Sequence, residues 1–256
     1  MQIRTGLAGV LLLSFGFSAL AQESPPNTYF PSIRDRQKYS EIVCFGTILK
    51  IQETNPSVRV EGAERSQWTA EARVDRVLKG NLDSKTIKFV YYSRGPDAGG
   101  GLGLPSANFQ TGVRYVLFLR GREPTLAVAV PFYQMEITIA LRPATVAMQM
   151  TGSDAILANE LLFAVQSSPA TTGSLASHYL EWVEELVGKK EAVPLVEVLL
   201  SSPSSLVRYQ AAWFMSFRTS DSKVLKVLES IAQDPSVEQW ARAGARDRLV
   251  DMRSRR

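Results

Sequence analysis

Residues 41–51 read EIVCFGTILKI, and residues 68–78 read WTAEARVDRVL. The first segment begins as an apolar run and ends in alternation, whereas the second alternates over most of its length. A period of two is typical of a β-strand with one buried and one solvated face. Residues 86–92, TIKFVYY, are rich in the β-branched and aromatic side chains that favour strands. These segments predict that the first half of the chain is a β-structure.

Turn-forming residues separate these strands from three shorter ones. Gly80-Asn81 supplies a turn, and the glycine-rich residues 95–105 predict a long flexible loop. The shorter strands are expected at 115–119, 126–130 and 135–139. Short strands punctuated by Gly, Pro and Asn are typical of a small β-barrel or sandwich. We therefore expect a β-domain over residues 40–145.

The second half of the chain changes to helical spacing. Apolar residues recur at intervals of three and four from Ser153, and a second series, capped by Thr172 or Ser174, stops near Gly188. Short links make consecutive helices antiparallel neighbours. We therefore predict an α+β protein with a helical domain over residues 150–253. Its further helices are expected at about 191–201, 204–217, 221–233 and 236–252, with starts marked by Pro203, Ser220 and Pro235.

The helical half contains a repeat with an offset of about 30 residues. The segment LLSSP, which ends at Pro203, is followed by Val207-Arg208; IAQDP, which ends at Pro235, is followed by Val237. Such an offset is within the range of stacked helical pairs. Residues 190–252 resemble HEAT-like repeats, although Glu238 stands where the first copy has Arg208. The resemblance implies an array that presents a surface to a protein partner.

The strand half resembles a second known module. Residues 42–48 (IVCFGTI), 72–80 (ARVDRVLKG) and 109–118 (FQTGVRYVLF) are similar to the OB-fold of tissue inhibitors of metalloproteinases, netrin C-termini and related bacterial exported proteins. In such a barrel, Gly46 permits a bulge where a strand bends. The inhibitors grip the protease zinc through an N-terminal cysteine. A mature chain that begins at Gln22 lacks this cysteine, so the resemblance implies the fold without that mechanism.

The first residues predict export. Arg4 is followed by an apolar run and then by Ala19-Leu20-Ala21, the pattern of a cleaved secretory signal over residues 1–21. The run is too short for a membrane span, which needs about 20 residues. Residues 22–39 are then a lead-in to the β-domain. The mature chain carries 28 Lys and Arg against 25 Asp and Glu, a balance too mild to indicate nucleic-acid binding. We expect a periplasmic or extracellular protein with no membrane span after cleavage.

A single cysteine and a single histidine restrict the possible chemistry. Cys44 stands alone, so no intramolecular disulfide can form, and its place in a strand predicts a small buried hydrophobe. His178 follows a helical spacing and predicts a packed or surface position. The usual zinc sites need three or four Cys, His or carboxylate ligands, and the chain has no G-x-S-x-G elbow. We predict no catalytic residue, no metal site and no cofactor.

Weaker candidates remain in the strand half. The run GGGLG at 99–103 lacks the Lys-Ser/Thr of a phosphate loop, so a loop between strands is the better interpretation. Glu136 and Asp97 are an example of two carboxylates that a fold can bring together for glycoside hydrolysis. Barrels often bind extended ligands at strand ends. The aromatic candidates there are Trp68, Tyr91, Tyr92, Phe132 and Tyr133.

In the helical half, Trp213, Phe214 and Trp240 recur at core spacing and are predicted to be packing residues. Six arginines that crowd together near the end of the chain predict a solvated helix face: Arg242, Arg246, Arg248, Arg253, Arg255 and Arg256. The sequence thus predicts an exported, non-enzymatic interaction protein with an unidentified protein partner. Two alternatives stay open: a protease-inhibitor-like module that acts through the barrel loops, notably the one at 95–105, and a carbohydrate-active enzyme that uses carboxylates.

Overall fold

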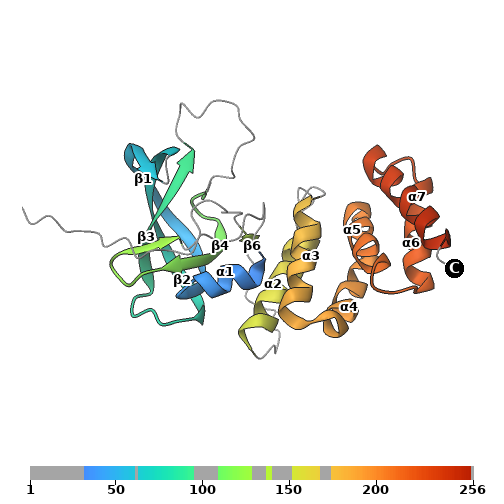
Figure 1. The fold of residues 1–256 in the computed structure, drawn as a ribbon, viewed down its shortest axis with the longest axis horizontal. Helices are drawn as coiled ribbons and strands as arrows, with labels where there is room; N and C mark the ends of the chain where they lie inside the picture. The colour runs from blue at the N-terminus through green and yellow to red at the C-terminus, as the bar shows by residue number, and fades with distance from the viewer. Residues whose placement is uncertain are drawn as a thin grey trace, which may run out of the picture.

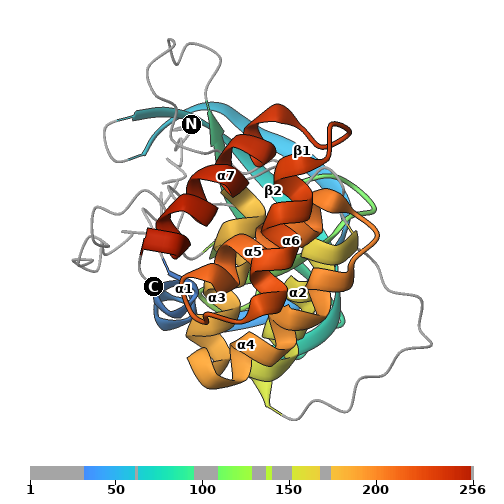
Figure 2. The same ribbon diagram turned by 90° about the vertical axis from the view of Figure 1, so that its right-hand side faces the viewer.

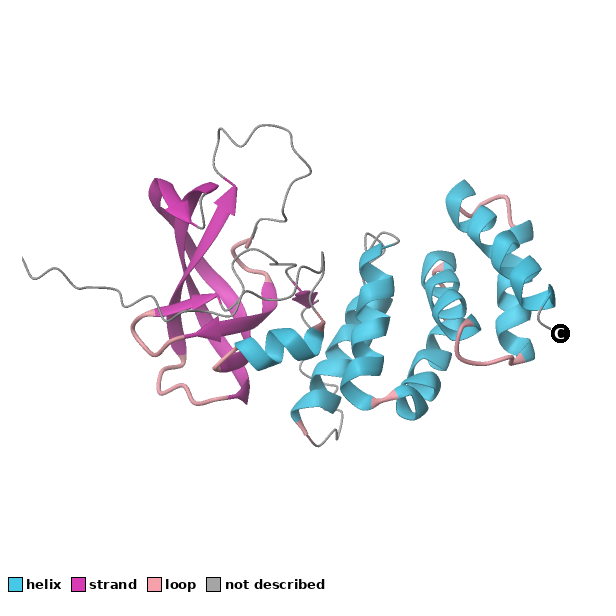
Figure 3. Cartoon of the chain, in the orientation of Figure 1, coloured by secondary structure: helices cyan, strands magenta, loops and turns pink. Residues whose placement is uncertain are grey.

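The computed structural model describes residues 32–60, 63–94, 109–128, 137–139, 152–167 and 174–254. It is a mixed α+β protein, with strands in the first half and helices predominating in the second (Figures 1 and 3). The predicted signal segment, most of the lead-in, the loop at 95–105 and residues 140–150 between the predicted domains lie outside the described residues.

The strands form one six-stranded sheet in which the pairings of five strands run in a closed ring. β1 pairs antiparallel with both β2 and β4, and the ring continues in the order β1-β2-β3-β5-β4. β3 and β5 pair in parallel, and β6 pairs antiparallel with the first residues of β4. The strands are β1 (Ile42–Val60), β2 (Ala63–Lys79), β3 (Thr86–Arg94), β4 (Arg114–Arg120), β5 (Leu126–Val128) and β6 (Ile137–Ile139).

Gly46 sits at an irregularity in β1, as the sequence predicts. The register between β1 and β2 shifts between Phe45 and Gly46. A Cβ atom on Gly46 would lie 2.7 Å from Cδ1 of Leu117 on β4. Glycine therefore lets β1 bend while it stays bonded to a strand on each side.

The apolar run at the start of β1 is explained by burial on both faces. Cys44 and Ile48 point into a core enclosed by the ring of strands, where Phe89, Tyr91, Tyr115 and Leu126 also lie. Val43 and Phe45 point the other way and pack in the same cluster as residues of the helical half. A strand buried on both faces reads as continuous apolar sequence. The first half of β1 therefore separates the core of the strand half from the core that it shares with the helices.

The helical half contains the predicted helices with small shifts at their starts. Ser204 caps α5 through its hydroxyl and Asp221 caps α6 through its carboxylate. Each of these helices therefore begins one residue after the start that the sequence predicts. α7 begins at Gln239, because residues 234–237 form a turn first. The helices are α2 (Ser153–Ser167), α3 (Ser174–Val187), α4 (Lys189–Glu197) with the short 3₁₀ helix η1 (Val198–Ser201), α5 (Ser205–Ser216), α6 (Ser222–Gln233) and α7 (Gln239–Ser254).

These helices form two rows. α5 packs against α3 on one side and α7 on the other, and α6 packs against both α5 and α7. Viewed from the end of the array, α3, α5 and α7 lie along one side (Figure 2). Small residues are fully buried on both α5 and α7, namely Ala211, Ala212, Ala241 and Ala245.

One helix of the first half was not expected from the sequence. α1 (Ile33–Tyr39) lies where the lead-in was predicted, between β4 and α3. Its Arg36 is buried, with its guanidinium carbon 6.0 Å from the ring centre of Phe118 and 5.4 Å from that of Trp182. Burial lowers the pKa of Arg36 to about 10, against a smaller opposing effect of Tyr179. The backbone N–H of Ile33 donates to Glu185 of α3 at 2.9 Å.

A charged cluster makes a second connection between the halves. Arg114 of β4 donates to Asp75 of β2 at 3.2 Å and to Glu160 of α2 at 3.3 Å. Its guanidinium carbon is 4.6 Å from the ring centre of Phe45. Thr47 also donates to Asp75, at 3.0 Å. α1 and this cluster together tie the sheet to the first two helices of the array.

Candidate functional site

The two side chains with the most reactive chemistry lie in separate environments. Cys44 is fully buried among strand residues, and this burial, with a smaller effect of Asp75, raises the pKa of its thiol to about 12. The prediction that Cys44 is buried is confirmed. His178 is half-buried on α3, with Nδ1 3.4 Å from Oε2 of Glu181 and its ring 6.5 Å from that of Trp182.

The structure brings no metal-binding set together in the part of the chain that it describes, where no three His, Cys, Asp or Glu residues are grouped to hold an ion. The carboxylates Glu136 and Asp97, the glycine run at 99–103 and the aromatic pair Phe132 and Tyr133 lie outside the described residues. The structure therefore gives no geometry for the hydrolytic alternative or for inhibition through the loop at 95–105.

The described aromatic residues of the strand half form a packed cluster. Phe109 meets the rings of Phe89, Tyr91 and Tyr115 edge-on, at 5.0–5.4 Å between ring centres. Trp68 stacks on Tyr91 at 6.4 Å and donates its indole N–H to the Ser93 hydroxyl at 2.7 Å. Phe89, Tyr91 and Tyr115 are almost fully buried. Edge-on packing of this kind stabilises a core, so the cluster closes one end of the strand core.

The helical half places aromatic residues quite differently. Tyr209, Trp213 and Phe217 follow one another at intervals of four, so they share one face of α5. Tyr209 and Trp213 lie 6.0 Å apart and Trp213 and Phe217 lie 5.5 Å apart, and Trp240 of α7 meets Tyr209 edge-on at 5.5 Å. We call this row of four rings, Trp240, Tyr209, Trp213 and Phe217, the α5–α7 seam.

Both ends of the α5–α7 seam are exposed to solvent. Trp240 is 43% exposed and Phe217 is 50% exposed, whereas Tyr209 between them is buried. The prediction that Trp240 is a core residue is therefore wrong, because α7 is the last helix of the described array and no later element covers this position. Phe214 is buried as predicted, and Trp213 is half-buried.

Gly244 of α7 leaves room for the Tyr209 side chain of the seam. A Cβ atom on Gly244 would lie only 2.2 Å from the hydroxyl oxygen of Tyr209. The absence of a side chain there lets the phenol reach α7. Burial, with a smaller effect of Asp247, raises the pKa of Tyr209. The phenol therefore stays neutral in the seam at physiological pH.

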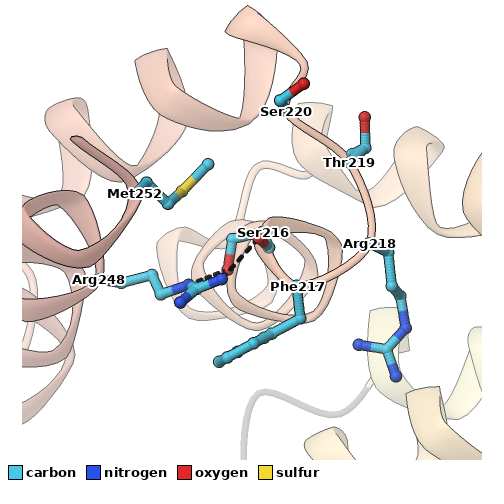
Figure 4. A pocket seen from close by; sticks show the side chains of 7 residues that line it. All are labelled: Ser216, Phe217, Arg218, Thr219, Ser220, Arg248 and Met252. Atoms are coloured by element: carbon cyan, nitrogen blue, oxygen red, sulfur yellow. Dashed lines mark hydrogen bonds between the residues drawn. The ribbon is translucent and has the colours of Figure 1, made fainter. Parts of the chain in front are cut away.

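A pocket of about 270 Å³ opens at the Phe217 end of the seam. Arg248 of α7 reaches the end of α5, where it donates to the hydroxyl of Ser216 at 2.7 Å and to its carbonyl at 2.6 Å. Its guanidinium carbon lies 3.6 Å from the ring centre of Phe217, and it also pairs with Asp251. Phe217 and Met252 supply apolar surface, while the Arg218 side chain points away from Arg248 (Figure 4).

Arg248 corrects the prediction that the C-terminal arginines form a solvated face. It is 3% exposed, and its bonds satisfy the carbonyl end of α5, where a cation is favoured. Arg246 and Arg253 are exposed on the same helix, as predicted. The spacing along α7 did not distinguish Arg248 from its neighbours; only the position of Ser216 on another helix does.

Two further arginines, Arg208 of α5 and Arg242 of α7, lie near Asp234. Arg208 donates to the carbonyls of Ser202 and Pro203, at 2.8 and 3.0 Å, and to the hydroxyl of Ser205. Nε of Arg242 is buried and has no hydrogen-bond partner among the described residues. Both arginines lie close enough to Asp234 to contribute to lowering its pKa, although hydrogen bonds from Ser236 are the larger cause.

The two helices of the seam carry more arginines than acidic residues. Residues 205–218 and 239–254 together contain six arginines and two acidic residues, Asp247 and Asp251. Arg218 pairs with Glu184 of α3, and Arg253 pairs with Glu229 of α6. Asp234 and Glu238, just before α7, add two further carboxylates. The seam is therefore distinguished by its exposed aromatic rings, a residue type that is enriched at protein interfaces.

No helix in the described ranges has both the length and the apolar character that a bilayer span requires. Compared with models of protein families and with the sequences of curated proteins, the chain matches none.

Proposed function

We propose that this chain is an exported, non-enzymatic interaction protein, built from an OB-like barrel and a HEAT-like helical domain, that binds protein partners. The observation that carries the proposal is the α5–α7 seam. Exposed aromatic side chains are among the residue types that dominate binding energy at protein interfaces. The seam leaves Trp240 and Phe217 in water at opposite ends of one row of rings.

The strand pairings support the OB-like part of the proposal. The ring β1-β2-β3-β5-β4 closes on β1, and its parallel β3–β5 pair is the one exception to antiparallel pairing. A five-stranded barrel is the architecture of an OB-fold. The bend at Gly46 lies in the part of β1 that pairs with both β2 and β4.

The order of the helices supports the HEAT-like part. α4 with η1 precedes α5, and α6 precedes α7, so each repeat of the sequence corresponds to a pair of helices. Pro203 and Pro235 stand just before the second helix of each pair. Stacked pairs of this kind generate a continuous surface from equivalent helices, here α3, α5 and α7.

A retention experiment tests the proposed function. The purified mature chain, residues 22–256, is immobilised and exposed to envelope extract and to culture supernatant, with the heat-denatured chain as control. We expect the folded chain to retain at least one protein in near-stoichiometric amount that the denatured chain does not. Repeated failure to retain any partner at low and physiological salt, or a reproducible catalytic turnover by the purified chain, would contradict the proposal.

A further inference from the structure

We draw no further inference here: the strongest candidate, the exposed aromatic face that Trp240 and Phe217 form at the two ends of the α5–α7 seam with the pocket beside Phe217, belongs to the site already described, and nothing in the described part of the chain shows what covers it.

Discussion

At the scale of single residues, Gly244 controls how the seam is built. Replacement of glycine by alanine within a helix ordinarily stabilises it by about 1 kcal/mol. At Gly244 the added methyl group would meet the Tyr209 hydroxyl at 2.2 Å. We predict that Gly244→Ala lowers the free energy of unfolding by about 1–2 kcal/mol instead, because Tyr209 must leave its position against α7.

A double-mutant cycle separates this clash from other effects of the substitution. Tyr209→Phe removes the hydroxyl, and the next ring atom is 3.3 Å from the added methyl group. Urea unfolding should show that Gly244→Ala costs less in the Tyr209→Phe background, with a coupling of about 1 kcal/mol. Additive effects of the two substitutions would contradict the geometry of the seam.

Cys44 provides a second prediction at this scale. With a pKa of about 12, its thiol is almost entirely protonated at pH 8, and it is also closed to solvent. We predict no reaction with a thiol reagent in native buffer and complete reaction of one thiol in urea. The unfolded thiol ionises first as pH rises, so its contribution to stability is complete below about pH 9 and decreases between about pH 9 and 12. Rapid labelling of the folded chain would contradict its burial.

At the scale of elements, the strand and helical halves are joined by specific contacts. Arg114 connects β4 to β2 and α2, and its side chain is 13% exposed, next to Asp75 at 22% and Glu160 at 11%. We predict that Arg114→Gln lowers the free energy of unfolding by about 2–3 kcal/mol, because it removes the cation that joins two partly buried carboxylates. Denaturant unfolding measures this change.

The surface pair Lys88–Glu71 is the matched control for Arg114. It joins two strands at 3.9 Å, and the Lys88 side chain is 70% exposed. Lys88→Gln should change the free energy of unfolding by less than about 1 kcal/mol, since water screens exposed pairs. Equal effects of Arg114→Gln and Lys88→Gln would show that the cluster does not join the halves.

Local sequence patterns predicted most elements and missed those that depend on distant partners. The alternation in residues 68–78 and the spacing from Ser153 follow from which face is buried, and the structure has β2 and α2 there. The α1 helix has only seven residues and an almost wholly polar sequence, IRDRQKY, so it has no hydrophobic periodicity from which it could be predicted. Its Ser32 cap is local, but its place between β4 and α3 is not.

The candidate site was less predictable than the fold. Trp240 has core spacing, but its exposure depends on α7 being the outermost helix of the described array. The four-residue spacing of Tyr209, Trp213 and Phe217 was readable as one helix face. Trp240 and Arg248 of α7 lie against that face of α5. This contact depends on packing between helices that are 20 or more residues apart in the sequence, so the local spacing did not predict it.

At the scale of the whole molecule, the packing of β1 and α1 against the helices predicts cooperative unfolding. Val43 and Phe45 share a core cluster with α2 and α3. We predict that two reporters, one chain that retains only Trp68 and one that retains only Trp213, lose structure at the same urea concentration. Two midpoints separated by more than about 0.5 M would show that the halves unfold independently.

The central claim is that the chain acts by binding a partner along the α5–α7 seam. Photo-cross-linking in cells that express the chain tests it most directly, with a photoreactive residue at Trp240 or, as control, at Val198, which is 70% exposed and lies outside the seam. The account predicts a discrete cross-linked protein from position 240 that is absent from position 198. Cross-linking from position 198 alone, or from neither position, would contradict it.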